Sequence, residues 1–119
     1  MSDINAFFSH SINLAEKAGI LRDCIVLDPG IGFGKTPEQS MEAIAKLEAF
    51  KRFDLPILVG ASRKRFIATI SPSEPMERIG GSLAAHLLSV RNGAAIIRTH
   101  DVAETIQAIK VDDALRAIK

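Results

Sequence analysis

Apolar residues near the start of the chain follow a spacing typical of helices. In residues 3–18 they recur every three or four positions, along the stripe Ile4, Phe8, Ile12 and Ala15. Because a helix turns once in about 3.6 residues, this spacing places the stripe on one face. The segment is therefore predicted to be an amphipathic helix with that face toward a core.

Three later segments are short and almost continuously apolar, at residues 24–27, 56–60 and 94–99. Runs of this kind are typical of parallel strands covered on both faces. Cys24 opens the first of them, so we expect a buried structural thiol there rather than a reactive one.

Helices are predicted between and after these strands. The longest cover residues 36–50, residues 75–90 and a last segment from Asp101 onward, with a helical turn from Ser62 and a loop at residues 71–75. The pattern of one helix followed by three strand–helix units predicts a single α/β domain over residues 1–119.

Local signals support the helix starts. Thr36 followed by Pro37 and Gln39 is a capping box, and Asp101 with Glu104 repeats the spacing. The residues of the 36–50 helix expected to face inward are Met41, Ile44, Ala45 and Leu47. Gly80 and Gly81 weaken the 75–90 helix unless close packing uses them.

Composition narrows the functional classes. A net charge of +1, no Trp or Tyr and six Phe argue against a nucleic-acid or anionic-membrane surface. The single cysteine excludes an internal disulfide. With no signal-peptide core and no membrane-length apolar run, the prediction is a soluble cytoplasmic protein.

Polar clusters follow each predicted strand. Asp28 leads into a glycine-rich loop, the second strand runs into Gly60 to Lys64, and the third into Arg98 to Asp101. Because parallel strands share one carboxyl edge, we expect these side chains to converge. One acid, several cations and one histidine suit a ligand with a donor-bearing ring and a separate anionic group.

Each of these residues also has a plain structural reading. Asp28 could be a turn or capping aspartate, and Arg63 and Lys64 could be solvated surface charges. His100 alone would be structural, but strand alternation can direct it and Arg98 the same way, where two donors suit a phosphate.

The glycine-rich loop resembles two nucleotide-binding motifs but lacks a glycine that each of them requires. The run Gly34-Lys35-Thr36 ends like a P-loop, but that motif needs glycine where Pro29 stands. The dinucleotide fingerprint would need glycine at Lys35. No metal-ligand spacing and no nucleophile–base arrangement is visible, so we assign no metal ligands.

At these clusters the chain resembles the dihydropteroate synthases. The matching stretches are Leu27–Lys35, Leu58–Lys64, Gly80–Ala84 and Ile97–Val102, in the family's order and spacing. The resemblance implies part of a (β/α)8 TIM barrel, with three parallel strands equivalent to the family's strands six to eight and their flanking helices. The implied reaction joins 6-hydroxymethyl-7,8-dihydropterin pyrophosphate to para-aminobenzoate and releases pyrophosphate in folate biosynthesis.

The resemblance also implies residue roles. Asp28 and Lys64 would hold the pterin. Arg98 and His100, with Thr99 between them, would hold the pyrophosphate, whose departing negative charge they would stabilise. The residues near the aminobenzoate would be Phe33, Gly60, Ser62 and Arg63. The implied mechanism is displacement without a covalent enzyme intermediate, with Asp28, Lys64, Arg98 and His100 as the catalytic set.

The match covers only the C-terminal part of the family. The family uses Mg²⁺, but its main protein ligand, an Asn, lies in the missing part. Three strands cannot close a barrel, so we expect the chain to associate with itself or to belong to a longer protein, and to be inactive alone. The alternative function is a non-catalytic ligand-binding or assembly remnant of that fold.

Overall fold

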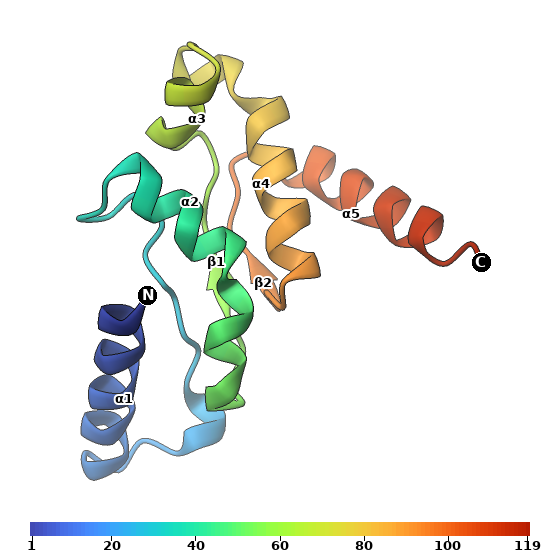
Figure 1. Ribbon diagram of the computed structural model, residues 1–119. Coiled ribbons are helices and arrows are strands. Elements are labelled where there is room, and N and C mark those ends of the chain that lie inside the picture. The colour runs from blue at the N-terminus through green and yellow to red at the C-terminus, as the bar shows by residue number, and fades with distance from the viewer.

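The computed structural model describes all 119 residues as a small parallel sheet flanked by helices (Figure 1). The α-helices are α1 (Ser2–Lys17), α2 (Pro37–Ala45), α3 (Arg65–Ile70), α4 (Ile79–Arg91) and α5 (Val102–Arg116). The strands are β1 (Leu58–Val59) and β2 (Ile96–Ile97), and short 3-10 helices are η1 (Arg22–Cys24), η2 (Leu47–Phe53) and η3 (Pro75–Glu77). The α/β class is therefore confirmed.

The sheet has two parallel strands instead of the three predicted. Leu58 lies opposite Ile96 in β1 and β2, and the first predicted strand is reduced to a single parallel bridge between Leu27 and Ile57. The Leu27 N–H donates to the Pro56 carbonyl at 2.9 Å, and the Leu27 carbonyl accepts from the Leu58 N–H at 2.8 Å. Pro29 has no N–H for the next bond, so the ladder ends there.

Helices cover one face of this sheet and leave the other open. Leu27, Ile57 and Val59 point into the buried core, whereas Val26 and Ile96 are 45% and 40% exposed. α1 closes one end of the core, where Phe8 packs edge-to-face on Phe50 with ring centres 5.2 Å apart. The open face is the one that carries Asp28 and Arg98, by strand alternation.

Local predictions were wrong at Cys24 and in the second half of the predicted 36–50 helix. Cys24 is exposed, because it lies in η1 before the pairing at Leu27 begins. The predicted 36–50 helix ends at Ala45 and continues as η2. At this break the Asn92 side chain donates to the Ile44 and Ala45 carbonyls, at 2.9 and 3.2 Å, in place of the next helical turn.

The four residues of this segment that were predicted to face inward differ in their burial. Ile44 and Leu47 are buried as predicted, Met41 is half-buried, and Ala45 is exposed. The capping box at Thr36 is confirmed, since its hydroxyl accepts from the Gln39 N–H at 3.1 Å while the Gln39 side chain accepts from the Thr36 N–H at 2.8 Å.

The α3–α4 contact explains one of the two helical glycines. A Cβ at Gly81 would lie 2.4 Å from Ile67 Cγ2, whereas a Cβ at Gly80 would meet nothing within 4 Å. Close packing therefore requires glycine at position 81 alone. None of the helices has the length and apolar character needed to cross a membrane.

Candidate active site

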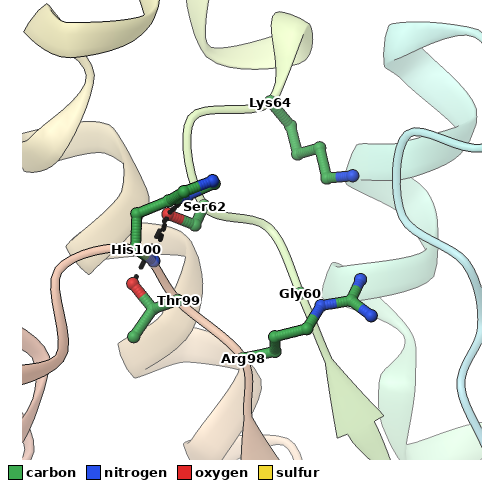
Figure 2. Close-up of a pocket in the computed structure, with 6 residues that line it drawn as sticks. All are labelled: Gly60, Ser62, Lys64, Arg98, Thr99 and His100. Atoms are coloured by element: carbon green, nitrogen blue, oxygen red, sulfur yellow. Dashed lines mark hydrogen bonds between the residues drawn. The ribbon is translucent and has the colours of Figure 1, made fainter.

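Residues at the ends of β1 and β2 surround one cavity, as predicted for two of the three strand-end clusters, whereas Asp28 and Phe33 of the first cluster line a separate pocket. The cavity at the ends of β1 and β2 has a volume of about 290 Å³ and is lined by Gly60, Ser62, Lys64, Arg98, Thr99 and His100 (Figure 2). No hydrophobic side chain lines it, and its charged side chains are Arg98 and Lys64. The cavity is therefore suited to an anionic ligand.

Arg98 lies across the backbone of the neighbouring strand end. A Cβ at Gly60 would stand 2.7 Å from Arg98 Nη2 and 3.0 Å from its Nε. Any larger residue at position 60 would push the guanidinium out of the cavity. Gly60 thus contributes space, and β2 and β1 together place the Arg98 cation.

Lys64 is the residue directly before α3, and its side chain lines the cavity. Burial lowers its pKa from the usual lysine value, the nearby Arg98 charge acts in the same direction, and Asp28 opposes them. Its ammonium lies 4.1 Å from the centre of the Phe33 ring, a cation–π contact. The structure thus brings the Asp28 carboxylate, Phe33 and Arg98 into the surroundings of this one ammonium.

The glycine-rich loop is built on left-handed backbone. Gly30, Gly32 and Gly34 have φ values of 70°, 84° and 61°, which favours glycine. The Gly30 N–H donates to Asp28 Oδ1 at 2.8 Å. One oxygen of Asp28 therefore stabilises the turn, as in the structural alternative given for this residue. Its second oxygen makes no hydrogen bond within the protein.

Lys35 holds the same loop from inside. Its ammonium donates to the Gly30 carbonyl at 3.0 Å and to the Phe33 carbonyl at 3.4 Å. The residue that broke the dinucleotide fingerprint therefore supports the loop that carries Asp28 and Phe33.

Arg63 has a left-handed backbone as well, with φ 58°. Its N–H donates to Ser82 Oγ at 2.9 Å, and its carbonyl accepts from the buried Arg78 guanidinium at 2.9 Å. Its own guanidinium forms an ion pair with Asp101 at 3.2 Å. The predicted cap at Asp101 is consequently wrong, because its side chain caps nothing and bonds to Arg63 instead.

The sequence did not indicate the buried side chains that hydrogen-bond to the backbone of residues 61–63. His86 is fully buried in α4 and accepts a hydrogen bond from the Ala61 N–H at Nε2, 3.0 Å away. Burial lowers its pKa to about 4, so it is neutral near pH 7. Arg78, Ser82 and His86 carry no local motif, and only their helical spacing along one face of α4 could have drawn attention to them.

A divalent metal does not fit the residues of this chain. No three His, Cys, Asp or Glu side chains are grouped to hold an ion, and cations line the cavity. Mg²⁺ prefers carboxylate oxygens and water, and no carboxylate lines this cavity.

Fold and site together define an α/β protein with a cationic cavity at the carboxyl ends of its parallel strands. Residues 1–100 match the model of the pterin binding enzymes, and the chain belongs to this family.

Individual relatives agree with the family match. The dihydropteroate synthase of Escherichia coli K12 is 42% identical over 118 residues, which cover 99% of this chain and 42% of that protein. The Yersinia pestis dihydropteroate synthase solved with a sulfonamide drug matches with a TM-score of 0.95 and 41% identity, over 100% of this chain and 43% of that one. The Xanthomonas albilineans dihydropteroate synthase solved with 4-aminobenzoic acid gives 0.95 and 38%, over 99% and 45%. The chain thus spans less than half the length of the relatives it matches.

Proposed function

We propose that this chain carries the pterin- and pyrophosphate-binding side of a dihydropteroate synthase site. The supporting observation is the cavity in which Arg98, Lys64 and His100 meet at the strand ends. The substrates would be 6-hydroxymethyl-7,8-dihydropterin pyrophosphate and para-aminobenzoate, in agreement with the 4-aminobenzoic acid bound to the Xanthomonas relative.

The pyrophosphate would lie against Arg98, Thr99 and His100. In the reaction the aminobenzoate nitrogen forms a bond to the pterin methylene carbon, the bond from that carbon to the pyrophosphate oxygen breaks, and the nitrogen loses one proton to solvent. Negative charge grows on the departing oxygen, where the Arg98 guanidinium would stabilise it. Removing one such preorganised donor typically costs about 10²–10³-fold in rate.

The pterin would lie between Asp28 and Lys64. The free oxygen of Asp28 can accept from the amino-heterocycle and can stabilise positive charge developing at the methylene. Lys64, held over Phe33, would border the pterin on the other side.

The aminobenzoate residues would act in two ways. Phe33 offers an exposed ring and Gly60 offers space. Ser62 and Arg63 already bond within the protein, so their contribution would be to shape the loop beside that substrate.

We further propose that the sheet is part of a (β/α)8 barrel. Its parallel pairing and the helices on one face support this arrangement. Catalysis by the complete site would then need strands beyond these 119 residues. The Mg²⁺ requirement and the cytoplasmic location stay predictions.

Calorimetric titration with dihydropterin pyrophosphate tests the binding role. We expect Arg98→Met to weaken binding about 10- to 100-fold, since a hydrogen bond to a charged group contributes about 1.5–3 kcal/mol. Arg116→Met, at the far end of α5, is the matched control and should leave affinity unchanged. No binding by the unsubstituted chain would overturn the proposal, and incorporation of labelled aminobenzoate measures turnover separately.

The open sheet face favours a second candidate, an assembly role with a homo-oligomer as its product. Val26 and Ile96 expose apolar surface beside unpaired strand edges, which favours association. We expect light scattering to show a mass above that of one chain, reduced by Val26→Lys with Ile96→Lys. A monodisperse monomer of the unsubstituted chain would contradict self-association.

A further inference from the structure

The Ser62 hydroxyl, in the loop after β1, forms hydrogen bonds with residues of the loop after β2. It lies 2.7 Å from His100 Nδ1, accepts from the His100 backbone N–H at 3.1 Å, and lies 3.4 Å from the Thr99 hydroxyl (Figure 2). The Thr99 oxygen in turn accepts from the Asp101 N–H at 3.1 Å. A chain of hydrogen bonds therefore runs from Asp101 through two hydroxyls to the imidazole.

Two hydrogen bonds accepted by Ser62 Oγ indicate the direction of these hydrogen bonds. A hydroxyl has one proton to donate and two lone pairs that accept. The Thr99 oxygen accepts from the Asp101 N–H at 3.1 Å, and the Thr99 hydroxyl donates to Ser62 Oγ at 3.4 Å. The Ser62 lone pairs then receive Thr99 and the His100 N–H, and its own proton points to Nδ1.

A neutral imidazole that accepts at Nδ1 must carry its proton on Nε2. We propose that Ser62 is a positioning residue, which holds His100 as the Nε2–H tautomer so that a donor faces phosphate oxygens in the cavity even when the ring is uncharged. The identity of the anion rests on the proposed function, whereas the tautomer follows from the hydrogen bonds alone.

The charged groups around the ring support a donor in that position. Arg98 and Lys64 line the same cavity, and the neighbouring Asp101 is paired with Arg63. An anion placed among these groups would meet a lone pair instead of a proton if His100 took the other tautomer, which would be repulsive.

His86 provides an internal standard of the opposite tautomer. Its Nε2 accepts from the Ala61 N–H, so its proton is on Nδ1, where it has no partner. The chain has only three histidines, and His10 lies exposed on α1. Imidazole ¹⁵N shifts at pH 8, where a histidine is ordinarily neutral, can therefore be assigned and compared within one sample.

In the unsubstituted chain we expect His100 to have its proton on Nε2, His86 on Nδ1, and His10 to show the average of a solvated ring. A His100 spectrum like that of His10 or His86 would overturn the inference. This measurement needs no substitution, so it does not depend on a variant folding. Ser62→Ala should move His100 toward the averaged shifts, and Ser89→Ala, at another buried serine on α4, should not.

Binding of inorganic pyrophosphate gives the second readout. At pH 8 we expect Ser62→Ala to bind about tenfold more weakly than the unsubstituted chain. At pH 5.5, where an imidazolium donates from both nitrogens, the loss should be under about threefold. An equal loss at both pH values would show a merely structural role and contradict the positioning role. If the unsubstituted chain binds no pyrophosphate, the proposed anion site fails, while the ¹⁵N shifts still decide the tautomer.

Discussion

The ammonium of Lys64 lies 4.1 Å from the centre of the Phe33 ring. Phe33 lies in the glycine-rich loop after Leu27, and Lys64 lies between β1 and α3. The contact therefore joins the glycine-rich loop to the start of α3. It holds Lys64, which lines the cavity, against a ring of the glycine-rich loop. Burial and the Arg98 charge lower the pKa of Lys64, in keeping with an ammonium that is partly withdrawn from solvent.

This contact predicts energetic coupling between the two side chains. A cation–π pair at a partly exposed position contributes about 0.5–1 kcal/mol. In a double-mutant cycle with Phe33→Leu and Lys64→Met, urea unfolding should give a coupling free energy in that range. If the effects of the two substitutions simply add, the contact makes no contribution to stability.

Asp28→Asn is expected to weaken dihydropterin pyrophosphate binding about 10- to 100-fold, since a charged acceptor is lost. The amide oxygen can still accept from the Gly30 N–H, as the carboxylate does at 2.8 Å, so the loop should keep its shape. Calorimetric titration measures the change, and Asp23→Asn, on the exposed η1 turn, is the matched control. Unchanged affinity would leave Asp28 with its turn role alone.

Because His86 is buried as a neutral ring, we expect the folded chain to lose stability in acid. The pKa of the ring is about 4 in the folded chain and about 6.5 when unfolded, so between these values the unfolded state binds more protons. Stability from the neutral ring is complete above about pH 6.5 and falls as the pH drops toward 4, by up to about 3 kcal/mol. Urea unfolding from pH 7 to pH 4 measures this slope.

Replacing the histidine separates this effect from general acid sensitivity. His86→Gln should flatten the dependence between pH 6.5 and 4, even though the substitution itself lowers stability. His10→Gln, at the exposed histidine of α1, should retain the full slope. The same slope in both variants would assign the acid sensitivity to other groups.

Gly81→Ala and Gly80→Ala form a matched pair with opposite expected signs. The added methyl at position 81 would lie 2.4 Å from Ile67 Cγ2, and overpacking of this kind costs about 1–3 kcal/mol. Position 80 is open, so alanine there should stabilise the helix by about 0.5–1 kcal/mol. Thermal unfolding of both variants tests the α3–α4 packing, which equal destabilisation would contradict.

Much of the architecture could be predicted because its causes are local. The amphipathic spacing of residues 3–18 corresponds to α1 within one residue at each end, and the Thr36–Gln39 capping box formed as expected. Both depend on residues within a few positions of one another. The convergence of the second and third strand-end clusters on one cavity was also predictable, since parallel strands share one carboxyl edge.

The errors fall where a distant group decided the outcome. Asp101 has the sequence of a cap, yet its carboxylate pairs with Arg63, which is 38 positions away. The predicted 36–50 helix ends where the Asn92 amide takes its carbonyls, 48 and 47 positions away. Local propensity contributes only tenths of a kcal/mol per residue, so one charged or buried partner can outweigh it.

The sequence by itself determined α1, the capped start of α2, the three polar clusters and the resemblance to the dihydropteroate synthases. Only the tertiary structure decided how those clusters work together: Lys64 over Phe33, Arg98 on Gly60, and Ser62 bonded to His100. Motifs are short stretches whose geometry is local, whereas each of these contacts requires two strand ends to lie side by side. The parallel pairing of β1 with β2 and the parallel bridge between Leu27 and Ile57 supply that condition.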